Sequence, residues 1–249
     1  MTVEYEKAGR VAVIRLNRPE KRNAFDSAMT EGLDRALNEL EDDPEIWAGV
    51  LTGVGQGFSA GTDLAAGSGA HTERGGEYGI IRRHRSKPLI AAVEGFAFGG
   101  GMEVVLACDL VVAARNAKFG LPEVRRGVIA TCGGLFRTQR ALPLNIAKEM
   151  LLTGDPLPAE RAYQVGFVNA LAEEGTVLKT ATELAHRICR NAPISVRESL
   201  IAVERSNSTD DETAWHITEQ AMLTTLASED TREGITAFLE RREPRWSGR

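Results

Sequence analysis

A serine flanked by glycines raises the first chemical possibility. Gly57-Phe58-Ser59-Ala60-Gly61 has the G-x-S-x-G spacing of a serine-hydrolase nucleophile elbow, in which a sharp strand-to-helix turn exposes the hydroxyl. The residues after Ser59, AGTDLAAGSGA, include three glycines that disfavour an immediate helix. None of the four histidines stands in a recognisable catalytic context. We therefore expect the backbone beside Ser59 to matter more than its hydroxyl.

The same stretch fits the start of a dinucleotide-binding fingerprint. Gly55, Gly57 and Ala60 have the spacing G-x-G-x-x-A. That fingerprint requires an immediate helix and an acidic residue at the end of a second strand about 20 residues further on. Glu73 and Glu77 fall instead in a polar stretch with helical character. The sequence therefore argues against a dinucleotide site.

A glycine triplet, Gly99 to Gly101, opens the helical segment GGGMEVVLACD. Glycines let a backbone approach a ligand closely, and the first N–H groups of a helix are unpaired and carry the positive end of its dipole. A tight strand-to-helix turn would explain the triplet equally well by itself. Together with GFSAGTDL, however, two glycine-flanked turns that each follow a buried strand could direct one N–H apiece at a single oxygen. That arrangement is an oxyanion hole.

Two glutamates near predicted helix starts are candidates for acid–base chemistry. Glu103 lies in the first turn after the triplet, where the helix dipole favours the charged carboxylate. Pro122 suits a first helical position, which places Glu123 just inside another helix start. Ordinary helix-end electrostatics is the alternative explanation for both.

The segments that carry these groups alternate between strand and helix patterns. Residues 3–16 predict a β-hairpin that turns at Lys7-Ala8-Gly9-Arg10. Residues 26–42 predict a helix capped by Asp26 or Ser27. The segments WAGVLTG, KPLIAAVEG and DLVVAA predict buried strands, and residues 72–86 predict a polar helix. From about Pro143 onward the chain is mostly helical, with predicted helices over residues 183–190, 194–205, 211–226 and 231–241.

Composition indicates an ordinary globular protein. The chain has 249 residues, of which 43% are hydrophobic and 26% charged, enough for one large core. A net charge of −5 with both signs scattered argues against a nucleic-acid partner. The first residues lack a signal-peptide layout, and no apolar run approaches the roughly 18 residues of a membrane span, so we expect a cytoplasmic protein.

The three cysteines, Cys108, Cys132 and Cys189, are odd in number and widely spaced. This spacing fits neither a disulfide framework nor a zinc site. We expect reduced thiols and no bound metal.

Several of these motifs together resemble the enoyl-CoA hydratase/isomerase, or crotonase, superfamily. The resemblance rests on GFSAGTDL, on AAVEGFAFGGGMEVVLACDLVVAARNAKFGLPEVRRG and on LLTGDPLPAERAYQVGFVN, and it extends from LNRPEKRNAF to EGITAFLERREPRW. It implies an α/β fold with a crotonase-like ββα spiral core over residues 1–190. Residues 191–249 would form a C-terminal helical region for oligomerisation. One such scaffold hosts several reactions, so the fold alone does not fix the chemistry.

The resemblance assigns roles to four of the residues above. The backbone N–H groups of Ala60 and Gly100 would hold the thioester oxygen of an acyl-CoA. Glu103 and Glu123 match the two glutamates of family hydratases, with Glu103 as base toward water and Glu123 as the acid that protonates Cα. Retention of both favours reversible addition of water to an α,β-unsaturated acyl-CoA. No cofactor is implied, because coenzyme A belongs to the substrate.

Substrate binding and assembly follow from the same resemblance. The backbone of Ala60-Gly61-Thr62-Asp63-Leu64 would contact the CoA, and Lys21 and Arg22 would meet its phosphates, although a solvated surface turn explains these two basic residues equally well. The family assembles trimers, often stacked into hexamers, so we expect a homotrimer or a dimer of trimers.

One segment departs from the common family pattern. Ala130, Thr131 and Cys132 stand where many hydratases have a proline followed by small residues, so the acyl specificity is open. Cys132 is either a pocket thiol or a buried structural cysteine. LPEVRRG and the polar stretch 69–79 are more similar to carnitinyl-CoA dehydratase-like members. Alternative functions are that dehydratase reaction, isomerisation, thioester hydrolysis, or acyl-CoA binding without turnover.

Overall fold

The N-terminal hairpin forms one edge of the main sheet. In the computed structural model, which describes residues 1–66, 71–207 and 209–249, β1 (Val3–Ala8) pairs antiparallel with β2 (Val11–Leu16). Gly9 turns the chain between them with a φ of 63°. The predicted hairpin is confirmed.

The main sheet continues from β2 as parallel strands in the order β1-β2-β3-β6-β8-β11. Its further members are β3 (Ala48–Gly53), β6 (Leu89–Val93), β8 (Leu110–Ala114) and β11 (Ala170–Ala172). β6 is buried along its whole length, as expected of a parallel strand covered on both faces. The three predicted buried strands are confirmed.

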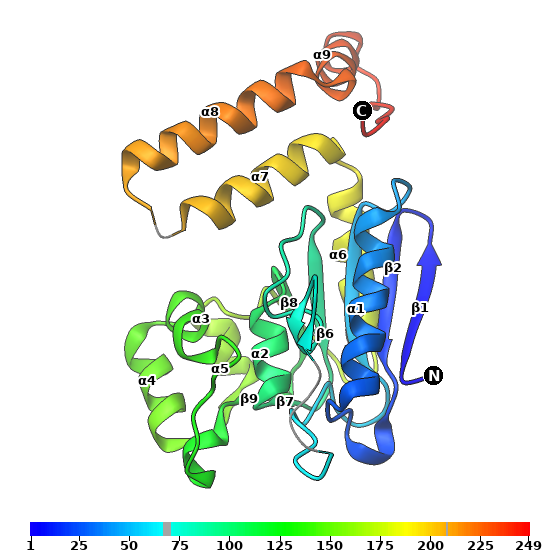
Figure 1. Cartoon of the computed structure of the whole chain (residues 1–249). Helices are drawn as coiled ribbons and strands as arrows, with labels where there is room; N and C mark the ends of the chain where they lie inside the picture. Colours follow the sequence, from blue (N-terminus) through cyan, green and yellow to red (C-terminus); the bar gives the residue numbers. More distant parts are fainter. Residues whose placement is uncertain (67–70, 208) are drawn as a thin grey trace.

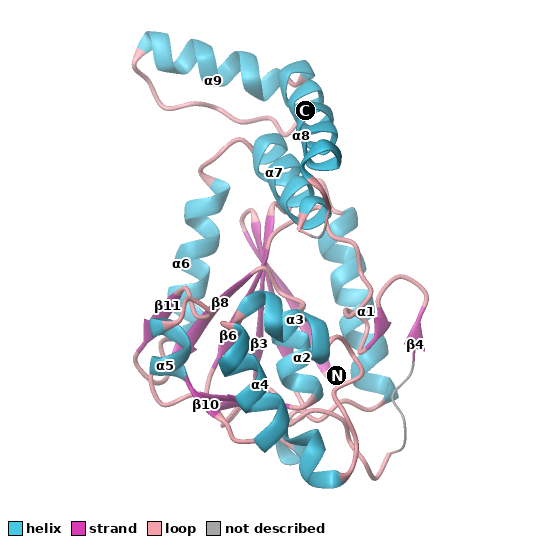
Figure 2. Ribbon diagram, turned by 90° about the vertical axis from the view of Figure 1, so that its left-hand side faces the viewer, coloured by secondary structure: helices cyan, strands magenta, loops and turns pink. Residues whose placement is uncertain are grey.

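Two long helices lie on either side of this sheet, as Figure 2 shows. α1 (Ser27–Asp42) packs against β1 and β2, and its N-cap is Asp26, whose side chain accepts a hydrogen bond from the Met29 N–H at 2.8 Å. α6 (Val177–Cys189) packs against β3, β6 and β8. The helix predicted for residues 26–42 is therefore confirmed.

A second, small sheet brings the two glycine turns together. It consists of β7 (Phe96–Phe98), β9 (Lys118–Gly120) and β10 (Leu157–Pro158). A bridge between Ser59 and Ala97 extends this sheet toward the turn that follows β3. These strands are only two or three residues long, too short to show a periodic pattern in the sequence.

The helix predicted for residues 72–86 is wrong. The chain instead forms a short hairpin of β4 (His71–Thr72) and β5 (Gly76–Glu77), followed by turns. Gly76 and Gly79 have positive φ values of 67° and 76°, which a right-handed helix does not accommodate. Of the polar stretch 69–79, residues 69 and 70 lie outside the described residues.

The remaining helices divide between the core and the C-terminal end. In the core, α2 (Gly100–Leu106) follows β7, and 3₁₀ helices form at Pro19–Lys21 and Pro122–Arg126. The other core helices are α3 (Gly134–Ala141), α4 (Leu144–Thr153) and α5 (Ala159–Gln164).

The last three helices, α7 (Pro193–Ser206), α8 (Asp211–Ala227) and α9 (Glu229–Glu240), lie together beyond one end of the sheet (Figure 1). They match three predicted helices to within two residues at every boundary. The predicted division at residues 190 and 191 falls in the turn between α6 and α7. Within the described residues, no helix is long and apolar enough to cross a membrane.

Candidate active site

The two glycine-flanked turns predicted from the sequence meet in space. Ser59 forms a parallel bridge with Ala97, and the Phe98 N–H donates to the Ser59 carbonyl at 3.0 Å. Gly61 lies against the start of α2, where a Cβ on Gly61 would be 2.9 Å from the Gly100 nitrogen. Because Gly61 also has a φ of 97°, only glycine fits this close approach.

Ser59 is a structural residue of the first turn. Its side chain is fully buried, and its hydroxyl donates to the Asn23 carbonyl at 2.8 Å and accepts from the Gly61 N–H at 3.1 Å. Both hydrogen-bonding functions are thus occupied by backbone. No helix follows Ser59 directly, so this segment forms neither a nucleophile elbow nor a dinucleotide-binding turn. The expectation that Ser59 lines the turn is confirmed.

The predicted role of the Ala60 N–H requires correction. This N–H donates to the carbonyl of Arg22 at 3.0 Å and is not available to a ligand. Phe25 donates to the Gly61 carbonyl and accepts from the Asp63 N–H, so the intervening Thr62 N–H faces away from the Phe25 segment. Among the described residues, the Thr62 N–H has no acceptor. Thr62 is therefore the free donor of the first turn.

Gly100 supplies the free donor of the second turn. It is the first residue of α2, whose first N–H groups have no acceptor within the helix. Gly99 precedes it as N-cap with a φ of 53° and offers no side chain to cap those groups. The predicted position of Gly100 beside the first turn agrees with the structure. The free N–H groups of Thr62 and Gly100 thus belong to two turns that contact each other.

Glu103 lies in the first turn of α2 and is only 2% exposed. Its Oε1 accepts a hydrogen bond from the Gly134 N–H at 3.0 Å. Burial raises the pKa of Glu103 to about 7, and the nearby Glu123 carboxylate adds to this effect, against the lowering by backbone N–H groups. The first turn of the helix favours the charged carboxylate, as expected from the sequence, but desolvation outweighs this effect and raises the pKa.

Glu123 approaches the same place from another element. It follows Pro122, which occupies a first helical position as predicted, although the helix is of the 3₁₀ type. A Cβ on Gly99 would lie 3.4 Å from Glu123 Oε1. Its Oε2 is buried and has no hydrogen-bond partner among the described residues. Burial also raises the pKa of Glu123. Two partly desolvated carboxyl groups therefore flank the start of α2.

The segment that departs from the family pattern forms part of the wall beside Glu103. Ala130 is buried, Thr131 is exposed and Cys132 is half-buried. Burial and the Glu103 carboxylate raise the pKa of the Cys132 thiol. Cys132 also packs against the hydrophobic core. The two interpretations offered for it, a pocket thiol and a buried structural cysteine, stay predictions.

A polar clamp that sequence reasoning missed holds the first turn. Asn23 is fully buried and donates to the carbonyls of Val54 and Gly57 at 2.9 Å each. Arg18 forms an ion pair with Asp63 at 2.8 Å. Both clamp residues belong to LNRPEKRNAF, where the only sequence signal was the mixture of asparagine and charged residues before a helix cap.

The predicted CoA-binding residues lie along the outer side of this turn. Lys21 and Arg22 are exposed, and the Arg22 carbonyl binds Ala60, so the basic pair adjoins the turn. Leu64 is 76% exposed. The Asp63 side chain accepts from Arg18, its N–H donates to the Phe25 carbonyl and its carbonyl accepts from the Ala66 N–H, so Asp63 helps to hold the turn.

Tyr78 is a further residue that sequence reasoning missed. It is 7% exposed, and its hydroxyl lies 2.7 Å from Thr62 Oγ1. Its loop was predicted to be a helix, and no sequence signal pointed to this contact.

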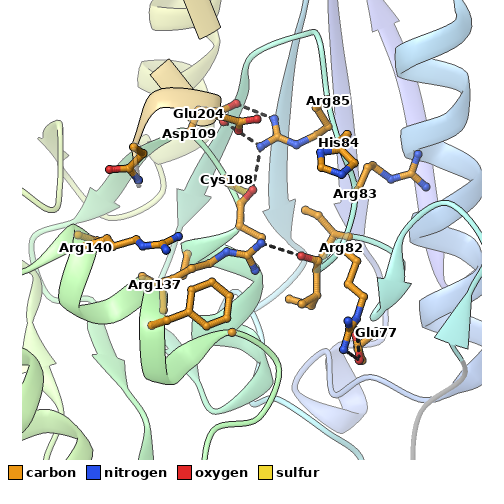
Figure 3. A pocket seen from close by; sticks show the side chains of 18 of the residues that line it. Glu77, Arg82, Arg83, His84, Arg85, Cys108, Asp109, Arg137, Arg140 and Glu204 are labelled. Carbon is orange, nitrogen blue, oxygen red and sulfur yellow. Dashed lines mark hydrogen bonds and ion pairs between the residues drawn. The ribbon is translucent and has the colours of Figure 1, made fainter. Parts of the chain in front are cut away.

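A cavity of about 930 Å³ lies between α3, α7 and the segment that precedes β6. Figure 3 shows its cationic wall, where Arg85 pairs with Asp109 and Arg137 donates to the Ile81 carbonyl at 2.7 Å. Thr131 and Gly133 line it, but Glu103 and Glu123 do not. The reactive groups therefore lie beside this cavity and not within it.

Among the described residues, no group of three or more histidine, cysteine or acidic side chains could hold a metal ion. Backbone N–H groups and the two carboxyls are the groups that this site offers for chemistry.

Comparison with known proteins places this site in a family. Residues 6–249 match the Enoyl-CoA hydratase/isomerase family, and the chain belongs to it. It is 37% identical over 246 residues to the short-chain-enoyl-CoA hydratase of Clostridium acetobutylicum, covering 96% of this chain and 94% of that protein. It is 36% identical over 252 residues to the carnitinyl-CoA dehydratase of Salmonella typhimurium, covering 97% and 96%.

Among solved structures, an enoyl-CoA hydratase from Mycobacterium tuberculosis H37Rv superimposes with a TM-score of 0.96 at 43% identity, covering 100% of this chain and 99% of that one. The fold is thus the crotonase fold that the sequence resemblance implied.

Proposed function

We propose that this protein is an enoyl-CoA hydratase, which adds water reversibly to an α,β-unsaturated acyl-CoA to give a 3-hydroxyacyl-CoA. The observation that carries this proposal is the placement of two desolvated carboxyl groups, Glu103 and Glu123, beside the start of α2. Hydration needs one group to accept a proton from water and another to donate one to carbon. A lone carboxylate would favour a different crotonase reaction.

The thioester carbonyl would accept hydrogen bonds from the N–H groups of Thr62 and Gly100. As water adds, negative charge moves onto this oxygen in an enolate-like state, and preorganised backbone donors stabilise it. One such donor contributes about 3–4 kcal/mol to transition-state stabilisation. Polarisation of the carbonyl also makes Cβ electrophilic.

The two glutamates would divide the proton transfers. Glu103, as carboxylate, accepts a proton from water while the water oxygen bonds to Cβ. Glu123, as carboxylic acid, delivers its proton to Cα, so that one H and one OH are added across the double bond. A general acid or base contributes about 10²- to 10⁴-fold each. Burial raises the pKa of both glutamates, which allows the pair to hold one proton near neutral pH. The family resemblance is what assigns that proton to Glu123.

The same groups in reverse would dehydrate a 3-hydroxyacyl-CoA. The carnitinyl-CoA dehydratase relative favours this direction as the second candidate function. CoA binding by the backbone of residues 60–64, with Lys21 and Arg22 near its phosphates, stays a prediction.

We also propose a homo-oligomer, as a trimer or dimer of trimers, built through the C-terminal helices. Large apolar side chains are exposed on α8 and α9, as expected of surfaces that another chain covers. They are Trp215, Met222, Leu223, Leu226, Ile235, Phe238 and Leu239. No cofactor is needed for the steps above, and a cytoplasmic location stays a prediction from composition.

The test is loss of the conjugated absorbance of crotonyl-CoA, measured for the wild type, Glu103→Gln, Glu123→Gln and the surface control Glu149→Gln on α4. We expect each site variant to lose at least about 10²-fold in kcat while the control keeps wild-type turnover. A wild type that is inactive on crotonyl-CoA and on longer and branched enoyl-CoAs would contradict hydration. Isomerase activity that survives Glu103→Gln would indicate a reaction through Glu123 alone.

A further inference from the structure

The Tyr78 hydroxyl is buried where the two glycine turns meet. It lies 2.7 Å from Thr62 Oγ1, and a Cβ on Gly100 would lie 2.5 Å from it. The phenol ring packs against Phe25 with centroids 5.0 Å apart. One side chain therefore contacts the residues that carry both free N–H groups.

The backbone at Tyr78 is in an uncommon conformation. Its φ is 53°, in the left-handed region, where a bulky residue is strained. Gly76 and Gly79 beside it also have positive φ values, so the loop is shaped to point this ring inward. Such strain persists only where surrounding contacts determine it, which makes the contacts of Tyr78 informative.

The hydroxyl requires an explanation separate from that of the ring. A phenylalanine would make the same apolar contacts with Phe25 and would not bury a polar oxygen. The hydroxyl makes a hydrogen bond of 2.7 Å with Thr62 Oγ1, and the Cys132 thiol also lies beside it. We therefore look for the role of the Tyr78 hydroxyl in its hydrogen bond with Thr62.

Thr62 has its backbone free on the side that faces α2. Hydrogen bonds of its neighbours Gly61 and Asp63 to Phe25 hold the chain on the opposite side. The Thr62 N–H belongs to the planar peptide between Gly61 and Thr62, whose carbonyl accepts from Phe25. The tilt of this peptide plane sets the direction of the N–H, and a restraint on the Thr62 side chain can fix that tilt. A hydrogen bond from that side chain to a rigid partner provides such a restraint.

We propose that Tyr78 is a positioning residue, whose hydroxyl fixes the Thr62 side chain and thereby orients the Thr62 N–H toward the thioester oxygen of the substrate. The inference rests on the proposed binding of an acyl-CoA thioester at the two N–H groups. Burial raises the pKa of Tyr78, so the phenol is neutral at physiological pH and does not act as a base. Its contribution is made through Thr62 and not by proton transfer to the substrate.

The kinetic test uses Tyr78→Phe, Thr62→Val, the double variant, Thr62→Ser and the exposed control Tyr163→Phe on α5. We expect Tyr78→Phe and Thr62→Val each to lower kcat on crotonyl-CoA by about 3- to 10-fold, the value of one hydrogen bond, with KM changed less than about twofold. The double variant should be no slower than the slower single variant, because both changes break one bond. Thr62→Ser restores the hydroxyl and should recover most of the loss.

A second readout does not depend on turnover. The infrared carbonyl stretch of bound butyryl-CoA, a saturated thioester that cannot be hydrated, reports hydrogen bonding to the thioester oxygen. We expect the stretch to move to higher frequency in Tyr78→Phe and Thr62→Val, and to stay at the wild-type value in Tyr163→Phe.

The outcomes separate the two proposals. If the wild type hydrates no enoyl-CoA but the carbonyl shift depends on Tyr78 and Thr62, the hydratase proposal fails and the positioning role stands. If Tyr78→Phe keeps wild-type kcat and carbonyl frequency, or if the losses of the double variant multiply, the positioning role is overturned. Should Tyr78→Phe not fold, Thr62→Val against Thr62→Ser decides the question in the same way.

Discussion

The turn at residues 57–63 and the turn at residues 99–103 face each other across the site, yet they are held differently. The first is fixed by side chains from elsewhere, with Asn23 bonding its backbone and Arg18 pairing with Asp63. The second has no capping side chain and takes its shape from the junction of β7 with α2. The first turn therefore offers one N–H, whose direction depends on hydrogen bonds from other segments. The second offers an N–H and a carboxyl group because both lie at the start of a helix.

The difference extends to electrostatic cost. In the first turn the charged groups Arg18 and Asp63 compensate each other, and Arg18 lowers the pKa of Asp63. In the second turn Glu103 is buried and forms no ion pair within the described part of the chain, and burial raises its pKa. The clamp therefore stabilises the fold, whereas the carboxyl pair is retained at a cost that its proposed role in catalysis explains.

The contact of Gly61 with the start of α2 provides the largest expected effect. Gly61→Ala would place a Cβ within 3 Å of the Phe98 oxygen and the Gly100 nitrogen, at a φ of 97°. We expect kcat on crotonyl-CoA to fall by at least about 10²-fold, since both N–H groups would be displaced. Gly9→Ala is the matched control, because Gly9 also has a positive φ but has open space around it. Equal kcat losses in the two variants would show that the contact between turns is unimportant.

Removal of the clamp should affect stability more than chemistry. Asn23→Ala leaves the carbonyls of Val54 and Gly57 and the Arg18 N–H without their partner. We expect the free energy of unfolding to fall by about 2–4 kcal/mol in a denaturant titration, because the Asn23 side chain is fully buried and the groups it binds are buried or half-buried. The exposed Asn145→Ala on α4 should change it by less than about 0.5 kcal/mol. A denaturation midpoint of Asn23→Ala equal to that of the wild type would contradict the stabilising role of the clamp.

At the second turn, loss of the buried charge of Glu103 should raise the free energy of unfolding, whereas loss of the clamp lowers it. The pKa of Glu103 is raised from its ordinary value of 4.5 to about 7, so folding favours its protonated form. The wild type pays no such penalty below about pH 4.5, and the penalty accumulates as the pH rises through about 7. Glu103→Gln removes it, so this variant should be about 1–3 kcal/mol more stable than the wild type at pH 8 and nearly equal at pH 4.

Thermal melts of the wild type, Glu103→Gln and Glu149→Gln across this pH range make the measurement. A Glu103→Gln advantage that is independent of pH, or that appears equally in Glu149→Gln, would mean that the buried charge is not its origin.

The smallest effect concerns the hydroxyl that first suggested a nucleophile. Ser59→Ala removes hydrogen bonds to Asn23 and Gly61. We expect about 1 kcal/mol lower stability and a kcat within about threefold of wild type, with the exposed Ser27→Ala as control for stability. Loss of turnover without loss of stability would reopen a chemical role for Ser59.

The sequence by itself determined the features that depend on local pattern. The hairpin, α1 and the buried strands followed from their periodicities, and Glu103 and Glu123 were found at helix starts because glycine and proline mark such positions. The family resemblance indicated which of these groups belong to one site.

Tertiary structure alone decided which groups are available and in what state. Whether Ala60 or Thr62 has the free N–H depends on pairing with Arg22 and Phe25, which are distant in sequence. The loop at Tyr78 departs from its predicted helix because tight glycine turns and a buried contact outweigh local propensity. The raised pKa of Glu103 comes from burial by the assembled core, since desolvation is a property of surroundings that no short segment contains.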